Sequence, residues 1–399
     1  MPSRKNTAAS AQRRVALVVE SSLTVGRQML RGIAEYIRQT GYWSVYYEPG
    51  HIQNTLPAWL ENWHGDGIIA RVRNRRLARR FAKMKLPVVD ILGDVPDTGI
   101  PSVQVNNLAI AELAATHLLE HGFQCFGFCG IRGHGWSRQR QDAFKASIAR
   151  SGYACHVRCL PSFYGKAWYS EVERERLAQW IAGLPKPVGI MAVNDWIGQK
   201  VLAACRHVGA LVPEEVAVIG VDNDEAICEI SDPMLSSIVP RHDRVGFYAA
   251  ELLDRLMQSK KPSLKKQPSN DLVVGVPSIV PRRSTDIQTI TDRDMAEAVR
   301  FIRENACGDI RVEEVAAHVA LSYSTLKRRF RKVLDRSVHD EIMRVRMERV
   351  RELLAETKMP LGQIARATGF RHQEYLGVAF KAQIGITPGQ YRKENSRQQ

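Results

Sequence analysis

The sequence lacks the long hydrophobic runs, the secretory leader and the disulfide pattern that would place it in a membrane or an oxidising compartment. No stretch reaches the roughly 18 apolar residues that a membrane-spanning helix needs. The first residues, MPSRKNTAASAQRR, contain no apolar core of a signal peptide. The seven cysteines are odd in number and scattered, so they form no disulfide framework. We expect a cytoplasmic protein without membrane contact.

What the chain has in excess is length and positive charge. Its 399 residues are too many for one hydrophobic core and fit two or three domains. The net charge of +15 favours polyanionic partners, because neutralised phosphates release counterions. Basic residues gather in a tail at 1–14 and in a run at 71–85 that holds eight of them and no carboxylate. The run could be a solvated helix face or a nucleic-acid contact.

Between residues 15 and 285, short apolar runs alternate with amphipathic stretches. Buried strands of a parallel sheet are expected at 15–20, 43–48, 66–72, 87–93, 126–130, 188–195 and 216–222. Helices are expected at 26–40, 108–121, 139–151, 169–183 and 195–208. Alternation of this kind indicates a sheet covered on both faces. Such sheets bind ligands beyond the carboxyl ends of their strands.

The alternation ends after Leu256. The Lys-, Pro- and Ser-rich stretch SKKPSLKKQPSND cannot bury a core face and predicts a loop. One more apolar run follows at 272–286, and the pattern is wholly helical from Thr291 onward. We therefore expect one domain over 15–285 and a second, all-helical domain over 286–399.

The helical part contains a segment with the pattern of a helix-turn-helix, at about 312–333. Its apolar spacing predicts one helix, a short turn at Ala320–Leu321, and a second helix that Ser322 caps with its hydroxyl. Leu326 and Phe330, four residues apart, face inward in the second helix. Polar and basic residues are left on its outer face.

The same pattern returns at about 361–384. Gly369 stands at the turn, and Leu376 and Phe380 repeat the inward spacing. The segment ITPGQYR follows at 386–392. Two helix-turn-helix motifs in tandem indicate DNA binding.

These tandem motifs resemble the AraC/XylS family of transcription regulators over the last hundred residues. The pattern GF-x(9)-FK-x(3)-G-x-TP-x(2)-YR runs from Gly369 to Arg392. The resemblance implies that outward residues of both second helices enter the major groove of a double-stranded operator. By position these are Ser324, Thr325, Lys327 and Arg328, then Gln373, Glu374 and Tyr375. For each of them, phosphate contact or plain exposure stays open.

The part over 15–285 resembles the effector domain of LacI-type repressors and the periplasmic sugar-binding proteins. GALVPEEVAVIGVDN at 209–223 and VNDW at 193–196 carry the resemblance, as does SRQRQDAF at 137–144. It implies an α/β fold of two lobes with parallel sheets and a sugar between them. The implied ligand-binding residues are Arg140, Asp195, Asp222, Asn223 and Trp136. Asp195 could instead cap a helix, and Trp136 could pack in the core.

Other motifs give no support for a cofactor or a metal. GIRGHGW at 130–136 has the wrong spacing for a dinucleotide loop. Cys125, Cys129 and Cys155, with His156 and Cys159, fit small core residues better than a zinc site. No order of Ser, His and Asp indicates nucleophilic catalysis, and we expect no enzyme.

The two resemblances together imply a sugar-responsive DNA-binding transcription regulator. They imply D-xylose or a related pentose as effector, and a homodimer on the operator, because proteins of these types commonly pair. Two alternatives stay open at this point: a cytoplasmic sugar-binding module without a regulatory role, and a sugar- or nucleotide-modifying enzyme.

Overall fold

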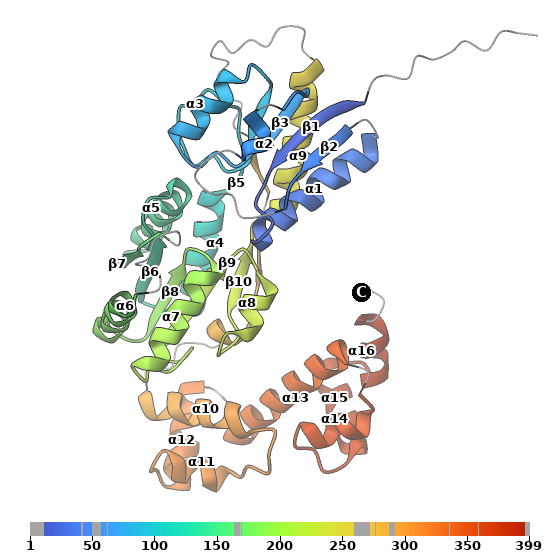
Figure 1. Cartoon of the computed structure of the whole chain (residues 1–399). Helices are drawn as coiled ribbons and strands as arrows, with labels where there is room; N and C mark the ends of the chain where they lie inside the picture. The colour runs from blue at the N-terminus through green and yellow to red at the C-terminus, as the bar shows by residue number, and fades with distance from the viewer. Residues whose placement is uncertain are drawn as a thin grey trace, which may run out of the picture. The chain divides into compact units, whose positions relative to one another are not determined.

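The chain divides into two compact units (Figure 1). The first comprises the chain up to Val208 together with Ala217–Asp286, and the second comprises Gly209–Val216 and the chain after Asp286. The computed structural model describes residues 12–40, 43–49, 57–61, 63–162, 168, 170–258, 272–275, 277–286, 292–334, 336–357 and 359–395. Most of the basic tail and the Lys- and Pro-rich stretch 259–271 lie outside these residues. Among those described, no helix is long and apolar enough to cross a membrane.

The first lobe of the first unit is a parallel sheet with the strand order β2-β1-β3-β4. β1 begins at Arg13, within the segment that the sequence assigned to the tail, because Arg13 and Arg14 pair with Trp43 and Ser44 of β2. The elements of this lobe are β1 (Arg13–Val18), α1 (Thr24–Thr40), β2 (Trp43–Tyr47), α2 (Ala58–Glu61), β3 (Gly67–Ala70), α3 (Arg75–Lys83) and β4 (Val88–Asp90).

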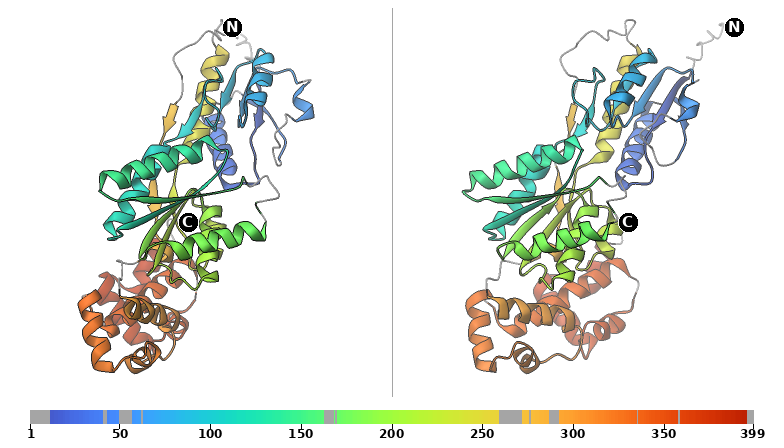
Figure 2. Two further views of the ribbon diagram at one scale, coloured as in Figure 1. Left: turned by 90° about the vertical axis from the view of Figure 1, so that its left-hand side faces the viewer. Right: turned by 60° about the vertical axis from the view of Figure 1, so that its left-hand side comes forward.

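The second lobe has the strand order β12-β10-β9-β8-β6-β7, in which β12 is antiparallel to β10 and β9 is parallel to it. Its strands are β6 (Cys125–Ile131), β7 (Cys155–Leu160), β8 (Val188–Ala192), β9 (Val216–Val221), β10 (Ser236–Val239) and β12 (Ser278–Val280). Its helices are α4 (Asn107–Glu120), α5 (Gly135–Arg150), α6 (Glu171–Gly183), α7 (Asp195–His207), α8 (Glu225–Ile230) and the short η2 (Arg283–Thr285). Figure 2 shows this sheet between teal helices on one side and green helices on the other. Covered on both faces, β8 and β9 are buried at every residue, which explains their continuous apolar runs.

The two lobes are joined where the chain passes from one to the other. β5 (Val103–Val105) leads from the first lobe to α4, and α9 (His242–Gln258) returns from β10 to pack against α1. β11 (Leu272–Val274) pairs in parallel with β5 and leads to β12. The two-lobed α/β fold with parallel sheets is the predicted one.

Helices α1 and α9 cross at very short distance. A Cβ added to Gly246 would lie 1.9 Å from the carbonyl oxygen of Met29, and one added to Gly32 would lie 1.8 Å from that of Asp243. Only glycine permits this approach. The crossing packs the first turns of α9 directly against α1.

The second unit is all-helical, and its helices form two hydrophobic cores. The first contains Val315, Leu326 and Phe330, and the second contains Ile364, Leu376 and Phe380. The long α13 contributes to both. The helices are α10 (Arg293–Asn305), α11 (Val312–His318), α12 (Tyr323–Leu334), α13 (Val338–Glu356), α14 (Leu361–Ala367), α15 (Gln373–Ile384) and α16 (Pro388–Asn395).

Each helix-turn-helix motif turns at a residue with positive φ. Ala320 has a φ of 52° between α11 and α12, and Gly369 has a φ of 75° between α14 and α15. At the start of α12, Ser322 Oγ accepts a hydrogen bond of 3.3 Å from the backbone N–H of Thr325. This bond confirms Ser322 as the cap of the first recognition helix.

Candidate functional site

Arg140 is a buried cation at the carboxyl ends of the second-lobe strands. Its side chain lies on α5 and the residue is 3% exposed. Nε donates to Asn107 Oδ1 at 2.9 Å, and Nη1 donates to the carbonyl oxygen of Val193 at 2.6 Å. Burial lowers the pKa of Arg140, while the carboxylates of Asp222 and Asp195 raise it. Its remaining nitrogen, Nη2, donates no hydrogen bond to any described residue and is available to a ligand.

Asp195, at the first position of α7, is tied to the protein by both carboxylate oxygens. Oδ1 accepts from Ser237 Oγ at 2.5 Å, and Oδ2 accepts from the backbone N–H of Asp224 at 2.7 Å. Burial and the neighbouring Asp222 raise the pKa of Asp195 well above its usual value. The cap of α7 is Asn194, whose Oδ1 accepts from the N–H of Ile197 at 3.0 Å. The alternative that Asp195 is the cap is therefore wrong.

Asp222 and Asn223 follow β9 in left-handed backbone conformations, with φ of 104° and 46°. Asp222 Oδ1 lies 3.2 Å from Nε2 of His242, the first residue of α9, and Asn223 Oδ1 accepts from Arg282 at 2.9 Å. The second oxygen of Asp222 accepts no hydrogen bond from the described residues, and Nδ1 of His242 is buried without a partner. Sequence reasoning missed His242, although it follows the end of β10 as Asp222 follows β9.

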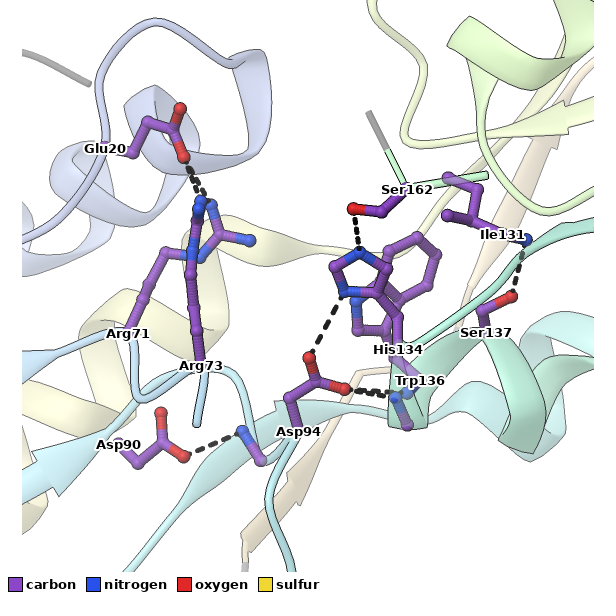
Figure 3. Close-up of polar contacts among 12 residues, drawn as sticks. Glu20, Arg71, Arg73, Asp90, Asp94, Ile131, His134, Trp136, Ser137 and Ser162 are labelled. Carbon is purple, nitrogen blue, oxygen red and sulfur yellow. Dashed lines mark hydrogen bonds and ion pairs between the residues drawn. The ribbon is translucent and has the colours of Figure 1, made fainter. Parts of the chain in front are cut away.

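On the first lobe, the strand ends carry a buried carboxylate between two arginines (Figure 3). Glu20, just after β1, is fully buried, and its Oε2 lies 3.3 Å from Arg71 and closer still to Arg73. Ser22 donates to Oε1 of the same carboxylate at 2.8 Å. Sequence reasoning left this part of the site undefined, since ESSLTVG at 20–26 is mostly small residues and the arginines come from another strand.

Asp94 links the first lobe to the second (Figure 3). It follows β4, yet its Oδ1 accepts from the backbone N–H of Gly135, and from that of Trp136 at 3.3 Å. Its Oδ2 lies 3.4 Å from His134 Nδ1, and His134 Nε2 lies 3.5 Å from Ser162 Oγ. Although Asp, His and Ser lie in a row, both separations exceed the roughly 2.6–3.2 Å of an activated serine. We interpret this row as a contact between lobes.

Trp136 is half-buried in this region. Its ring lies 5.2 Å from the guanidinium of Arg140 and beside the ring of His134. Trp168 is buried under Lys200, and Trp196 is 42% exposed. Of these tryptophans, Trp136 is the one that contacts the other predicted site residues. Among the described residues, no group of three or more His, Cys, Asp and Glu side chains could hold a metal ion.

In the second unit, α12 presents a basic outer face. Ser324, Lys327 and Arg328 are exposed, whereas Thr325 is half-buried and accepts from Ser322 Oγ at 2.8 Å. Three of the four predicted residues, all but Thr325, line a shallow groove on this face. The full lining is Tyr323, Ser324, Lys327, Arg328, Arg331 and Lys332. Four cations on one helix face suit a duplex with its dense phosphate charge.

The outer face of α15 is less charged. Gln373, Glu374 and Tyr375 are all exposed, and Gln373 Nε2 donates to Glu374 Oε1 at 3.4 Å. Val378, on the same face, is 70% exposed. An apolar side chain at this place can contact a thymine methyl group but holds no phosphate.

Comparison with known families assigns each part of the chain. Residues 14–104 match the XylR N-terminal domain, residues 115–285 a periplasmic binding protein-like domain, and residues 315–394 a helix-turn-helix domain. In its domains the chain is similar to an AraC/XylS-type transcription regulator with a periplasmic-binding-protein-like domain. The matched domains of the regulator agree with the two resemblances seen in its sequence.

Curated relatives cover the regulator nearly from end to end. The xylose operon regulatory protein of Escherichia coli K12 is 29% identical over 391 residues, which cover 96% of this chain and 97% of that protein. The protein of the same name from Haemophilus influenzae is 28% identical, with 95% and 98% covered. A solved structure described as the xylose-binding transcription activator xylR superposes with a TM-score of 0.82 at 29% identity, covering 97% of this chain and 99% of that one.

Proposed function

We propose that the regulator controls genes of xylose utilisation: D-xylose or a related pentose binds between the lobes of the first unit and alters operator binding by α12 and α15. End-to-end similarity to xylose operon regulatory proteins supports the gene set. Its target is DNA, which lies in the cytoplasm of the bacteria that hold its relatives, so we place its action there.

The observation that carries the sugar site is a free donor beside a free acceptor. Nη2 of Arg140 and one oxygen of Asp222 have no partner among the described residues, although the two side chains interact electrostatically. Vicinal sugar hydroxyls donate and accept at once, so they can satisfy both groups. Trp136 and Asn223 complete the wall, and Asp195 orients the loop that holds Asp222.

For DNA, we assign base reading to Lys327 and Arg328, with Ser324 and Thr325 at the start of the same helix. Arginine or lysine can meet guanine O6 and N7, and glutamine can pair with adenine. In the second motif we assign contacts to Gln373, Glu374 and Tyr375. Two motifs per chain and a protein of this type favour a homodimer on the operator.

The test measures both ligands on the full chain. A thermal-shift series with D-xylose, L-arabinose and D-glucose should single out D-xylose, since a ligand at 100 times its dissociation constant stabilises by about 2.7 kcal/mol. The binding sequence is selected from a pool of random duplexes, and the affinity for that duplex is then measured with and without the sugar. Sugar binding with no effect on DNA affinity would favour the alternative, a sugar-binding module without a regulatory role.

A further inference from the structure

One short segment of the sugar-binding half of the sequence belongs to the DNA-binding unit. Gly209–Val216 connect α7 to β9, with Val216 as the first residue of β9, yet they form part of the second compact unit. Leu211 is 6% exposed and lies in the same hydrophobic core as Met295, Val299 and Ile302 of α10. This segment is therefore built into the fold that carries the first helix-turn-helix.

An ion pair fixes the segment to α10. Glu214 is 1% exposed, and its Oε1 lies 3.2 Å from Nη1 of Arg303, whose side chain is 12% exposed. The second oxygen, Oε2, is buried without a hydrogen bond. The nearby Arg300 pairs with Glu297 at 2.8 Å instead. A buried carboxylate held by one main partner depends strongly on that partner.

Helix α10 is also tied to the recognition helix. Arg329 of α12 pairs with Asp292, the cap of α10, at 2.6 Å and with Asp294 at 2.9 Å. A displacement of α10 would therefore act on α12 directly. Contacts run without a break from Glu214 through Arg303 and α10 to Arg329.

The elements on either side of Gly209–Val216 along the chain are α7 and β9, and the other end of each lies at the candidate sugar site. α7 begins at Asp195, whose carboxylate holds the loop after β9, and β9 ends at Val221, next to Asp222. α7 has 13 residues and spans about 20 Å, and a helix and a buried strand of this length move as rigid bodies. Both lead directly into Gly209–Val216.

We propose that Glu214 and Arg303 are positioning residues that couple sugar binding to DNA reading, by transmitting movements of α7 and β9 to α10. This inference rests on the proposed function. Its consequence is specific: loss of the pair leaves each ligand's own site intact and removes the effect of one ligand on the other.

The experiment measures that effect as a ratio. Operator affinity of the full chain is measured without sugar and with saturating D-xylose, and the ratio is the coupling factor, typically about 5–150-fold in allosteric proteins. Glu214→Gln and Arg303→Gln should bring it close to one while D-xylose affinity by calorimetry stays within about two-fold of wild type. Arg303→Lys, which keeps the charge, should retain part of it. Asp232→Asn is the matched control, because it breaks the exposed Arg206–Asp232 pair at the end of α7.

A double variant distinguishes coupling from general damage. If the pair acts as one unit, Glu214→Gln with Arg303→Gln lowers the coupling factor no further than either change alone. Should Glu214→Gln not fold, the two Arg303 variants carry the test. A wild-type coupling factor in the folded variants, or an equal loss in Asp232→Asn, would overturn this inference but not the proposed function. A wild-type chain without any sugar effect would overturn the proposed function itself.

Discussion

Most charged atoms of the candidate sugar site already have protein partners, and this decides which ones remain for a ligand. Both oxygens of Asp195 and both of Glu20 accept bonds from neighbouring residues. One nitrogen of Arg140 and one oxygen of Asp222 do not. Since unpaired polar groups in a closed cleft are costly, a ligand that satisfies them gains affinity and orientation together.

Asp222→Asn tests sugar binding at this site more sharply than any change at Arg140 does. Asparagine keeps the size and tolerates positive φ, whereas loss of Arg140 would leave Asn107 and the Val193 carbonyl without their donor. We expect D-xylose binding to weaken by about 1.5–3 kcal/mol, the worth of a hydrogen bond to a charged group, as measured by calorimetry. Asp232→Asn on the same unit should leave it unchanged, and equal affinities in all three proteins would place the sugar elsewhere.

His117 gives the first unit a dependence on pH. Burial and the neighbouring His121 lower the pKa of His117 from 6.5 to about 4. The unfolded chain therefore takes up this proton first, so stability from this group is present above about pH 6.5 and is lost as the pH falls toward 4. Glutamine can still form a hydrogen bond with Thr285. In His117→Gln, the difference in the free energy of unfolding between pH 7 and pH 5 should be smaller than in the wild type by about 1–2 kcal/mol.

Tryptophan fluorescence in a urea series at each pH measures the free energy of unfolding. It reports the first unit, because all seven tryptophans precede residue 209. Burial raises the pKa of Asp90 to about 6, which lowers stability as the pH rises through that value. This opposing effect is present in both proteins and cancels in their difference. Parallel pH profiles for wild type and variant would contradict the assignment.

At the same scale, the sequence predicted candidate site residues that lie near the end of a single strand, and it did not predict contacts that only tertiary pairing creates. Asp222 directly follows β9, and Arg140 lies on α5, the helix that follows β6; a parallel sheet collects its ligand groups at such strand ends. Asp94 and His134 meet only because two lobes approach each other, and no periodicity within either segment carries that information.

At the scale of elements, α12 and α15 make the two motifs unequal. We expect Arg328→Ala to cost about 1–3 kcal/mol on the operator and to relax preference at one base position, because a bidentate contact to guanine is lost. Lys332→Ala, farther along the same groove, serves as the comparison: a phosphate contact weakens all sequences alike and lowers the salt slope by about one. Binding to operator and scrambled DNA over a salt series separates them. Equal losses on both DNAs for Arg328→Ala would make it a phosphate contact.

The amphipathic helices and the strands with continuous apolar runs were predicted, whereas strands β5, β7 and β11 were not. The strands at 188–195 and 216–222 are buried on both faces, so their apolar runs are unmistakable. β7 lies at the edge of its sheet with exposed and half-buried residues, and CHVRCL carries no continuous run. β5 and β11 have three residues each and gain their conformation from pairing with one another, 169 positions apart in register.

At the scale of the whole molecule, the division of labour follows the two units. The first contains the candidate sugar residues, and the second contains α12 and α15, the two helices proposed to bind DNA. The sequence indicated the change near Asp286 from the end of the alternating pattern. It gave no sign that Gly209–Val216 would belong to the second unit, because the segment matches its neighbours in composition and only three-dimensional packing of Leu211 reveals it.

Assembly on DNA follows from the same division. Of the two helices proposed to read DNA, α15 has an exposed valine and few cations, so we expect a single chain to hold DNA mainly through α12. Joining two chains makes the second binding event intramolecular and can raise affinity by about 10²–10⁴-fold without a new contact. We therefore expect two chains per operator at saturation, with occupancy that rises cooperatively with protein concentration. Sedimentation of the complex at several protein-to-DNA ratios counts the chains, and a duplex cut to half of the operator should hold one chain with sharply lower affinity. A single chain on the intact operator at saturation would refute the homodimer.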